Sequence, residues 1–403
     1  MTTVDLMARW ESVSMDGLHV RRAREDDWDA LHDAYDRAFG GIRAKDVASW
    51  RRQFRLSDIA VAEDISDPDA PFLVGSLAVL RMRITAPGGG QLRAAVCAQG
   101  LIAPTHQKRG IYARLQAETL YIAREFDADV FGGAPGPGAH YGYAGPAAHT
   151  RSLRIDRRRA KLLAGADDSG WCRESRPGAA RPLIREIYER WQRGTPGALD
   201  RSAHFWAATF DDESFVIVHP DGYVLYDLIG DVVRVRDFCA VTAAAHRELL
   251  RCLLGHTEYA EIQLETALDD PTPLLFEDPR VTAVTGVGAE LRMFILNAPK
   301  AFERRAYRAD FHGVIEVTDP YGMGSGLFGL DVTAGEGRWE PVPAGTPPDV
   351  RVGPVELASA YFGAHTPLEL WRAGRIQELT AGAVTALDNA LVPDRRPVNI
   401  TAV

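Results

Sequence analysis

Residues 99–113 read QGLIAPTHQKRGIYA and hold the strongest local signal of the chain. The apolar run over residues 92–102 predicts a strand, residues 103–110 a tight loop, and the apolar spacing of residues 111–126 a helix, on which Glu118 is a polar exception. A strand, a loop and a helix in this order place unpaired backbone N–H groups at the start of the helix, where an anion can bind.

The residue types of this loop suit a diphosphate. Gly110 lets a phosphate approach the main chain closely, while Lys108 and Arg109 add positive charge. A basic turn that caps an ordinary helix is the competing interpretation. A Walker loop is excluded because no Gly-Lys-Ser/Thr follows the required glycines, which disfavours ATP hydrolysis.

The spacing resembles the pyrophosphate loop of GNAT acyltransferases, which reads Gln or Arg, two residues, Gly, one residue, and Gly or Ala. Tyr112 takes the last place here. The resemblance implies that the strand before the loop, residues 99–102, splays from its neighbour and pairs with the pantetheine amides of coenzyme A. The residues expected to bind acetyl-CoA or another acyl-CoA are Gly100, Leu101, Ile102, Gln107, Lys108, Arg109, Gly110, Ile111 and Tyr112.

The remaining pattern divides the chain into three segments that mix strands and helices. The first continues with strands over 59–62, 72–79, 80–84 and 127–131 and a helix from Asp26. The second, from about residue 150, repeats this order with a helix over 181–193, a hairpin over 215–228, a strand over 232–240 and a helix to 254, but has no basic glycine loop. The third, from residue 294, predicts a helix over 299–307, strands over 314–317 and 329–332, helices over 354–361 and 368–371, and a final strand over 397–403. An α/β (α+β) fold with more than one domain follows.

With this loop placed, nearly the whole chain resembles the Eis (enhanced intracellular survival) family of mycobacterial aminoglycoside N-acetyltransferases. The signposts are EDDW at 25–28, APTH at 103–106, YERW at 188–191, HPDGY at 219–223 and AVT at 240–242. The resemblance implies tandem GNAT folds, each a mixed sheet with flanking helices, followed by a domain like sterol carrier proteins. The expected domains are 1–148 with the acyl-CoA site, 149–293 as a degenerate GNAT-like domain, and 294–403. A homohexamer and an acetyl-CoA-dependent N-acyltransferase are implied, with an amine of a small molecule, such as an aminoglycoside or another natural product, attacking the thioester directly.

The family mechanism implies a base that accepts the amine proton and an acid that protonates the thiolate. The base of the family is the C-terminal carboxylate, here that of Val403, and shielding from water would raise its basicity. A frayed terminus is the competing interpretation. The acid of the family is a tyrosine whose place falls on Gly138 or Ala139. His140 or Tyr141 could supply the proton instead, or the thiolate could leave unassisted, while Tyr143 is expected to pack in the core.

The substrate pocket of the family also differs here. The residues expected in this pocket are Phe39, Trp50, which matches a pocket tryptophan of the family, and Gln99. An acidic residue of the family near Phe39 is replaced by Gly40-Gly41. A narrower amine substrate than the polycationic aminoglycosides becomes the expectation.

Composition limits the other functions. The 403 residues carry a formal net charge of -9 with scattered basic residues, which argues against a nucleic-acid partner. No signal peptide and no run of eighteen apolar residues occur, so we expect a soluble, cytoplasmic protein without a membrane partner. The four cysteines are scattered and no His-Glu-x-x-His occurs, so no metal site is expected. No Gly-x-Ser-x-Gly hydrolase elbow lies at a strand-to-helix turn.

Two alternatives stay open. The missing tyrosine is compatible with a catalytically altered or inactive binding member of the family. Gly100 and the small residues of 132–139 are compatible with a larger acyl donor or a hydroxyl acceptor.

Overall fold

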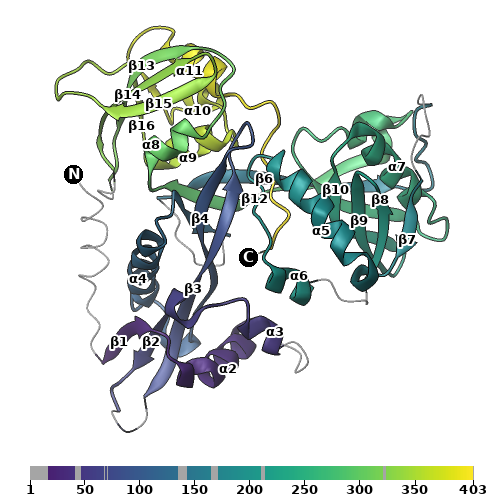
Figure 1. The fold of residues 1–403 in the computed structure, drawn as a ribbon, viewed down its shortest axis with the longest axis horizontal. Helices are drawn as coiled ribbons and strands as arrows, with labels where there is room; N and C mark the ends of the chain where they lie inside the picture. Colours follow the sequence, from purple (N-terminus) through teal and green to yellow (C-terminus); the bar gives the residue numbers. More distant parts are fainter. Residues whose placement is uncertain are drawn as a thin grey trace.

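The computed structural model describes residues 17–40, 47–67, 69, 71–134, 143–164, 171–209, 214–320 and 324–402. Its strands form two sheets (Figure 1). In spatial order the twelve-stranded sheet contains β1 (Leu18–Arg22), β2 (Ile59–Asp64), β3 (Phe72–Thr85), β4 (Gln91–Ile102), β5 (Val130–Gly133), β12 (Thr282–Ile295), β6 (Gly145–Asp156), β11 (Glu261–Thr266), β10 (Val232–Ala240), β9 (Gly222–Ile229), β8 (Phe215–His219) and β7 (Arg173–Ser175). The five-stranded sheet contains β15 (Glu336–Pro341), β14 (Gly326–Thr333), β13 (Phe311–Val317), β16 (Val350–Val352) and β17 (Gln377–Glu378).

The helices fall into three groups along the chain, each beside its own part of the sheets (Figure 1). The first group is α2 (Trp28–Phe39), α3 (Val47–Arg51) and α4 (Ile111–Glu125), the second α5 (Pro177–Arg193), α6 (Ala203–Thr209) and α7 (Ala243–Leu254), and the third α8 (Ala298–Glu303), α9 (Pro354–Phe362), α10 (Pro367–Arg372) and α11 (Ala383–Leu391). In the described residues, no helix combines the length and the apolar character needed to cross a membrane. The predicted class, mixed sheets with flanking helices, is confirmed.

Opposite faces of the first half of the sheet bury different side chains. Because successive side chains of a strand point to opposite faces, Val61 and Ala78 pack under α2, whereas Ala62 and Val79 pack under α4. The candidate site lies at the end of β4, between α2 on one face of the sheet and α4 on the other.

Strand β12 joins the two halves of the large sheet. It lies antiparallel to both β5 and β6. Its Met293 is opposite Gly132 of β5 on one side and Gly145 of β6 on the other. The sequence analysis did not predict β12 or β6, because both are rich in glycine, alanine and polar residues and lack the alternation that marks a strand.

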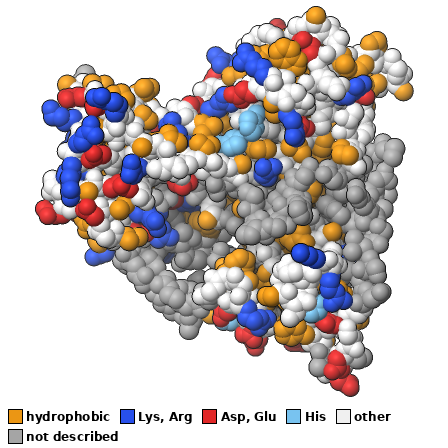
Figure 2. Space-filling model, turned by 180° about the vertical axis from the view of Figure 1, so that it is seen from behind, with side chains coloured by type: hydrophobic (Ala, Val, Ile, Leu, Met, Phe, Trp, Pro, Cys, Tyr) orange, Lys and Arg blue, Asp and Glu red, His pale blue; other side chains and the backbone are white. Residues whose placement is uncertain are grey.

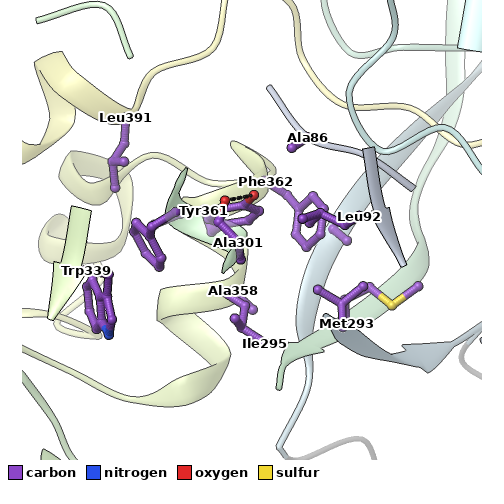
Figure 3. Close-up of a cluster of buried hydrophobic side chains, with 14 of the residues drawn as sticks. Ala86, Leu92, Met293, Ile295, Ala301, Trp339, Ala358, Tyr361, Phe362 and Leu391 are labelled. Carbon is purple, nitrogen blue, oxygen red and sulfur yellow. Dashed lines mark hydrogen bonds between the residues drawn. The ribbon is translucent and has the colours of Figure 1, made fainter. Parts of the chain in front are cut away.

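The C-terminal domain shares one core with the N-terminal half of the sheet. Figure 3 shows Tyr361 and Trp339 of this domain in the same cluster as Leu92 of β4 and Met293 of β12. The close approach requires Gly145, because a Cβ there would lie 1.9 Å from the carbonyl oxygen of Val355. The domains are therefore packed together and fix one another's position.

Several predicted elements differ from the structure. Residues 72–84, predicted as two strands, belong to the single strand β3, and α8 ends at Glu303 rather than at residue 307. Residues 397–402 join neither sheet, since the tail is held by single backbone bonds and by side chains instead.

The face shown in Figure 2 carries basic and acidic side chains side by side. The densest basic run of the sequence, residues 157–159, follows β6 and contacts neighbouring elements. The Arg157 side chain donates to the carbonyl of Tyr259 at 2.7 Å, and Arg158 lies 3.5 Å from Asp231. These partners indicate a structural role for the run.

Candidate active site

Strands β4 and β5 separate at the start of the site. They pair in parallel from Ala94 to Cys97, while β4 continues along β3 to Ile102. Beyond Cys97, none of the described residues pairs with β4 on the β5 side. A strand edge with unpaired N–H and C=O groups can pair with the amides of an extended ligand.

A β-bulge lies within this separated part of β4. Ala98 lies opposite Ala78 of β3 and Leu101 opposite Ser76, so β4 holds one more residue than β3 over this stretch. Within the bulge, Gln99 has a φ of 58°. A left-handed residue other than glycine stores strain of about 1–3 kcal/mol, and such residues cluster at functional sites.

The loop after β4 has the shape expected of an anion site. Its 3₁₀ turn, Pro104–His106, is followed by Lys108 with a φ of 63° and Gly110 with a φ of 75°, and α4 begins at Ile111. Left-handed residues in such a turn direct successive N–H groups to one side, beside the positive end of the helix dipole.

The ring of Tyr112 lies over Gly100. A Cβ at Gly100 would lie 3.4 Å from Cε2 of Tyr112 and 3.1 Å from Cδ1 of Leu77. The contact with Tyr112 would be about an ordinary van der Waals contact, whereas Leu77 would have to shift by a few tenths of an ångström, so a glycine suits this closely packed position.

Side chains fix the loop to the sheet. The amide of Gln107 donates to the carbonyl of Ile102 at 2.8 Å, and Nε2 of His106 lies 3.0 Å from Asp64 at the end of β2. Hydrogen bonds from Ser66, with a smaller contribution from His106, lower the pKa of Asp64 to about 2. The carboxylate therefore stays charged opposite the loop at any ordinary pH.

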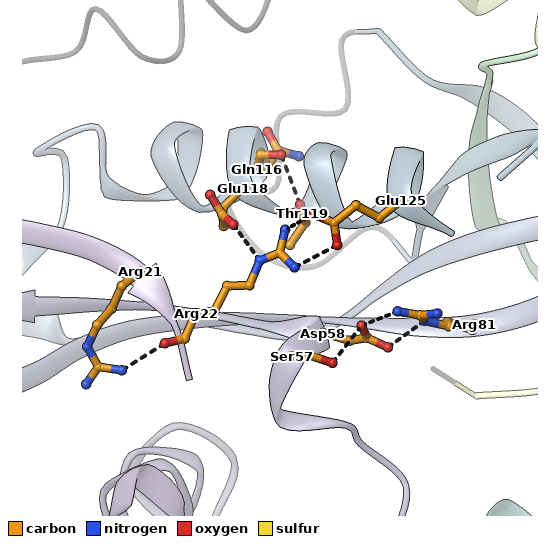
Figure 4. Close-up of polar contacts among 9 residues, drawn as sticks. All are labelled: Arg21, Arg22, Ser57, Asp58, Arg81, Gln116, Glu118, Thr119 and Glu125. Atoms are coloured by element: carbon orange, nitrogen blue, oxygen red, sulfur yellow. Dashed lines mark hydrogen bonds and ion pairs between the residues drawn. The ribbon is translucent and has the colours of Figure 1, made fainter. Parts of the chain in front are cut away.

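Ion pairs hold α4 in place behind the loop (Figure 4). Arg22 of β1 donates through Nε to Glu118 at 2.8 Å and through Nη2 to Glu125 at 2.7 Å. Glu118, the polar residue on the otherwise apolar face of α4, is thus the ion-pair partner of Arg22.

The one cysteine near the separated strands is not a nucleophile. Cys97 is 3% exposed, and burial raises the pKa of its thiol to about 12. Because the thiolate is the reactive form, a covalent acyl-cysteine intermediate at this position is disfavoured, and direct transfer is favoured.

A small apolar pocket, with free space for about one water molecule, opens on the α2 side of the bulge. We call it the aromatic pocket; its described lining residues are Leu31, Tyr35, Trp50, Phe54, Ile59, Ser76, Ala78, Gln99 and Leu101. The indole N–H of Trp50 donates to Oε1 of Gln99 at 3.1 Å, which links the bulge to α3. Trp50 meets the rings of Tyr35 and Phe54 at 5.6 and 5.9 Å.

The C-terminal tail runs from the last domain into the centre of the molecule (Figure 1). Its Thr401 is 2% exposed and hydrogen-bonds through its hydroxyl to Tyr188 at 2.7 Å. Tyr188 donates in turn to the carbonyl of Leu199, and Arg201 donates to Thr401 at 3.0 Å and to the carbonyl of Ile400 at 3.1 Å. The tail is therefore held in place as far as Thr401.

Arg201 is itself fixed by a buried ion pair. Its guanidinium binds both carboxylate oxygens of Asp237, at 2.5 and 3.1 Å, and Tyr223 donates to the same carboxylate at 2.9 Å. Burial alone would lower the pKa of Arg201, but the Asp237 carboxylate raises it well above its usual value. The arginine is followed by α6, which packs against α3, the helix that carries Trp50. The segment that follows the tail anchor thus lies against the helix that carries Trp50.

Two histidines meet where the tail passes β6. The rings of His149 and His365 are 4.8 Å apart at nearly a right angle, and the backbone N–H of His149 donates to the carbonyl of Pro397 at 3.4 Å. Nδ1 of His149 lies 3.3 Å from the carbonyl of Gly288, and Nδ1 of His365 lies 2.8 Å from the hydroxyl of Ser359.

The surroundings of these rings disfavour their charged forms. Burial lowers the pKa of both His149 and His365 below the ordinary value of 6.5, and the positive charges of Arg292 and Arg396 lower it further. Glu369 acts in the opposite direction on His365. A depressed histidine pKa means that the unfolded chain binds protons first, so stability is complete above about pH 7 and decreases as the pH falls below 6.5.

We therefore expect the melting temperature to fall between pH 7 and pH 5, and the double substitution His149→Gln with His365→Gln to reduce this slope. Burial lowers the pKa of His246 and His256 as well, so their part of the slope should remain. Differential scanning fluorimetry across this range measures it. His312→Gln, at an exposed position of β13, is the control and should leave the slope as it is. If the melting temperature of the double variant depended on pH as steeply as that of the parent, these two histidines would not be the source of the effect.

The structure places the sequence-predicted site residues as follows. The residues of β4 and of the loop, 100–102 and 107–112, lie together at the separated edge. Trp50 and Gln99 meet in the aromatic pocket, while Phe39 lies at the end of α2 with its ring 4.7 Å from that of Tyr35. The candidates for acid and base, His140, Tyr141 and Val403, lie outside the described residues.

Tyr143 is a core residue, as expected. It is 2% exposed, its hydroxyl accepts from Gln116 at 2.7 Å, and its ring stacks with Phe131. The sequence analysis missed Tyr35 and Phe54 as pocket residues, although each lies four residues from another lining residue, a helical spacing that could have revealed them.

Models of known families match all three parts of the chain. Residues 19–145 and 197–293 match models described as acetyltransferase (GNAT) domains, and residues 298–399 match a sterol carrier protein domain. The first match contains the loop and the second lacks one, which agrees with the predicted tandem arrangement.

Similar proteins cover nearly the whole chain. N-acetyltransferase Eis of Mycobacterium tuberculosis (strain CDC 1551 / Oshkosh) is 32% identical over 394 residues, which are 92% of this chain and 96% of the relative. An uncharacterized N-acetyltransferase of Streptomyces griseus is 31% identical over 384 residues, 85% of this chain and 90% of the relative. The crystal structure of Eis1 from Mycobacterium abscessus has a TM-score of 0.82 at 26% identity and covers 96% of this chain and 100% of its own.

Proposed function

Because the chain belongs to the Eis family of GNAT N-acetyltransferases, we propose that it transfers the acetyl group of acetyl-CoA to an amine of a small molecule, by direct attack of the amine on the thioester. The observation that carries the proposal is the separation of β4 from β5 at Cys97, immediately before the loop that ends at Gly110. A strand edge and an anion site in succession suit a cofactor whose pantetheine amides are followed by a diphosphate.

The proposed cofactor contacts follow the order of the chain. Gly100, Leu101 and Ile102 offer main-chain groups to the pantetheine amides, and residues 107–112 bind the diphosphate through N–H groups and the charges of Lys108 and Arg109. The thioester then lies near Gln99, at the mouth of the aromatic pocket.

The proposed reaction takes one proton from the amine and gives one proton to the coenzyme A thiolate. The neutral amine forms a bond to the acetyl carbon, the C–S bond breaks, and the amine loses a proton while coenzyme A leaves as the thiolate. We propose the terminal carboxylate of Val403 as the base, because the tail is anchored as far as Thr401, and the helix that follows its partner Arg201 packs against the helix of Trp50. Tyr141 or His140 is proposed as the acid, and the thiolate leaves unassisted if neither acts.

Acetyl-CoA binding and turnover test the proposal. Isothermal titration should show one acetyl-CoA site per chain, and a thiol reagent should detect free coenzyme A when an amine is added. Propionyl-CoA and longer thioesters compare the donors. A chain that binds no acyl-CoA would end the proposal.

Gly110→Val should weaken acetyl-CoA binding about 10- to 100-fold, because the left-handed turn opens and one or two charge-assisted hydrogen bonds to the diphosphate are lost. Isothermal titration measures the affinity. Gly382→Val is a matched control, since Gly382 precedes α11 with a φ of 84° and has open space around it. If Gly110→Val and Gly382→Val lost acetyl-CoA affinity equally, the loss would come from strain in the fold and not from the loop at Gly110.

The expected assembly and location remain predictions. The family leads us to propose a homohexamer in the cytoplasm, and light scattering after size-exclusion chromatography measures the mass of the assembly.

A further inference from the structure

We propose that the second GNAT-like domain is a peptide-binding module whose ligand is the C-terminal tail of the chain, residues 396–401. It holds the tail at an opening between β10 and β11, the counterpart of the opening between β4 and β5 that is proposed to hold the cofactor. The inference rests on the proposed function in one respect: the tail carries the proposed base, so the second domain controls the reaction of the first.

The second domain repeats the strand separation of the first. Strands β10 and β11 pair in parallel from Val232 to Arg234, while β10 continues to its end along β9. Beyond Arg234, none of the described residues pairs with β10 on the β11 side. A β-bulge follows directly, between Val235 and Asp237, as a bulge in β4 follows the end of its pairing with β5. The second domain thus has an opening of the same kind, with a free strand edge.

This second opening lacks the loop that forms the anion site of the first. Only Val241 and Thr242 separate β10 from α7, whereas residues 103–110 separate β4 from α4. The hydroxyl of Thr242 caps α7, because it accepts the backbone N–H of Ala245 at 3.2 Å. A helix that starts so soon after the strand and is capped by its own side chain leaves no loop for a diphosphate, so an acyl-CoA does not suit this opening.

The tail crosses the opening on the face of the sheet that α5 and α6 cover. Val398 is 4% exposed and belongs to the same apolar cluster as Tyr223 of β9 and Cys239 of β10. Ile400 packs against this cluster, and so does Ala267, the residue after β11. The cluster also contains side chains of α5 and α6. The tail therefore shares one apolar core with both strands that separate.

Polar contacts hold the tail from both sides of the opening. On the β10 side, the ion pair of Asp237 with Arg201 places the Arg201 guanidinium 3.0 Å from the hydroxyl of Thr401. On the β11 side, Asp269 lies just past the end of the strand and accepts the backbone N–H of Arg396 at 2.7 Å. The two ends of the bound segment are thus fixed by partners that follow different strands.

Asn399 shapes the peptide between these two ends. It is 5% exposed, and its Oδ1 accepts the backbone N–H of Thr401 at 3.2 Å and that of Leu199 at 3.4 Å. Its Nδ2 donates to the carbonyl of Thr401 at 2.8 Å. These bonds close a turn that satisfies backbone groups of the tail without a neighbouring strand. The module therefore recognises a peptide with an apolar residue at position 398, an asparagine at 399 and a hydroxyl at 401.

A chain that is cut after it has folded tests the module. A protease recognition sequence inserted between Asp394 and Arg395, two exposed residues, lets the full chain fold before residues 395–403 are separated from it. We expect the released segment to stay with the cut chain through size-exclusion chromatography, or, where it is washed out, a synthetic peptide of residues 395–403 to bind in its place.

Fluorescence anisotropy of this peptide, labelled at its N-terminus, measures the affinity. We expect a Kd of about 10 µM or lower for the cut and washed chain. The uncut chain is the matched control, because its own tail occupies the opening, and it should not bind the labelled peptide. Coenzyme A release should fall when the segment is washed out and return to the rate of the uncut chain when the peptide is added.

Two peptides that carry the same new residue test the contacts. Val398→Asp places a carboxylate in the apolar cluster and should weaken binding about 100-fold or more. Ala402→Asp adds the same charge at an exposed position and should leave the affinity within about threefold of the parent peptide.

The outcomes separate this inference from the proposed function. If the segment leaves the cut chain and the labelled peptide fails to bind at about 1 mM, or if the two aspartate peptides bind equally weakly, the inference is overturned while acetyl-CoA binding can still stand. If the peptide binds as expected but the chain binds no acyl-CoA, the proposed function fails and the module stands. Bound peptide that does not restore coenzyme A release would overturn the control of the first domain by the second.

Discussion

Extending the chain by two glycines after Val403, or deleting Val403, should lower kcat by roughly 10²–10⁴-fold, the usual contribution of a general base. Both changes move the terminal carboxylate while leaving the anchored residues up to Thr401 in place. Acetyl-CoA affinity should stay the same, since no proposed cofactor contact involves the tail. Coenzyme A release at saturating amine measures kcat.

A pH profile separates loss of a base from loss of folding. In the parent, kcat should fall on the acid side as the carboxylate is protonated, and this limb should disappear in the extended chain. Two glycines added before Met1 control for the extension itself. An extended chain that keeps kcat within about threefold of the parent would remove the terminal carboxylate from the mechanism, because a general base typically contributes about 10²–10⁴-fold.

Arg201→Leu should lower the free energy of unfolding by about 3–5 kcal/mol, the usual effect of leaving one partner of a buried ion pair alone. The side chains of Arg201 and Asp237 are only 2% and 7% exposed, so water does not replace the lost partner. The tail also loses its bonds at Ile400 and Thr401, so kcat should fall as well. Urea denaturation and coenzyme A release measure the two effects.

A double variant distinguishes the two effects. Replacing both partners, Arg201→Leu with Asp237→Leu, removes the isolated charge and should recover most of the stability, but it does not restore the hydrogen bonds to the tail. We therefore expect a stable chain with low kcat. A double variant with both stability and kcat of the parent would show that this anchor does not position the terminus.

The sequence predicted the parts of the site whose signal is local. The loop around Gly110 is recognised because residue type, charge and position after a strand agree within a few residues. Trp50 was placed in the pocket through the family resemblance, and its partner Gln99 lies where the same resemblance expects the strand to separate. The tandem arrangement was predicted because the second segment repeats the order of elements of the first.

The rest depends on contacts between residues far apart in the chain. The anchor joins Arg201 to Thr401 across 200 positions, and neither residue belongs to a motif that would indicate its partner. Strand β12 was missed because pairing with β5 and β6 stabilises it, whereas its own glycine and alanine residues do not favour a strand. The tail was predicted as a strand from its apolar residues, but single backbone bonds, side-chain hydrogen bonds to Thr401 and the packing of Val398 hold it instead.

The most direct test of the central claim is a crystal structure of the full chain with coenzyme A bound. We predict the diphosphate against the N–H groups of residues 107–112, the pantetheine along β4 from Gly100 to Ile102, and the thiol facing the carboxylate of Val403 across the space in which the amine attacks. Coenzyme A bound elsewhere, or a terminal carboxylate far from the thiol, would contradict the account.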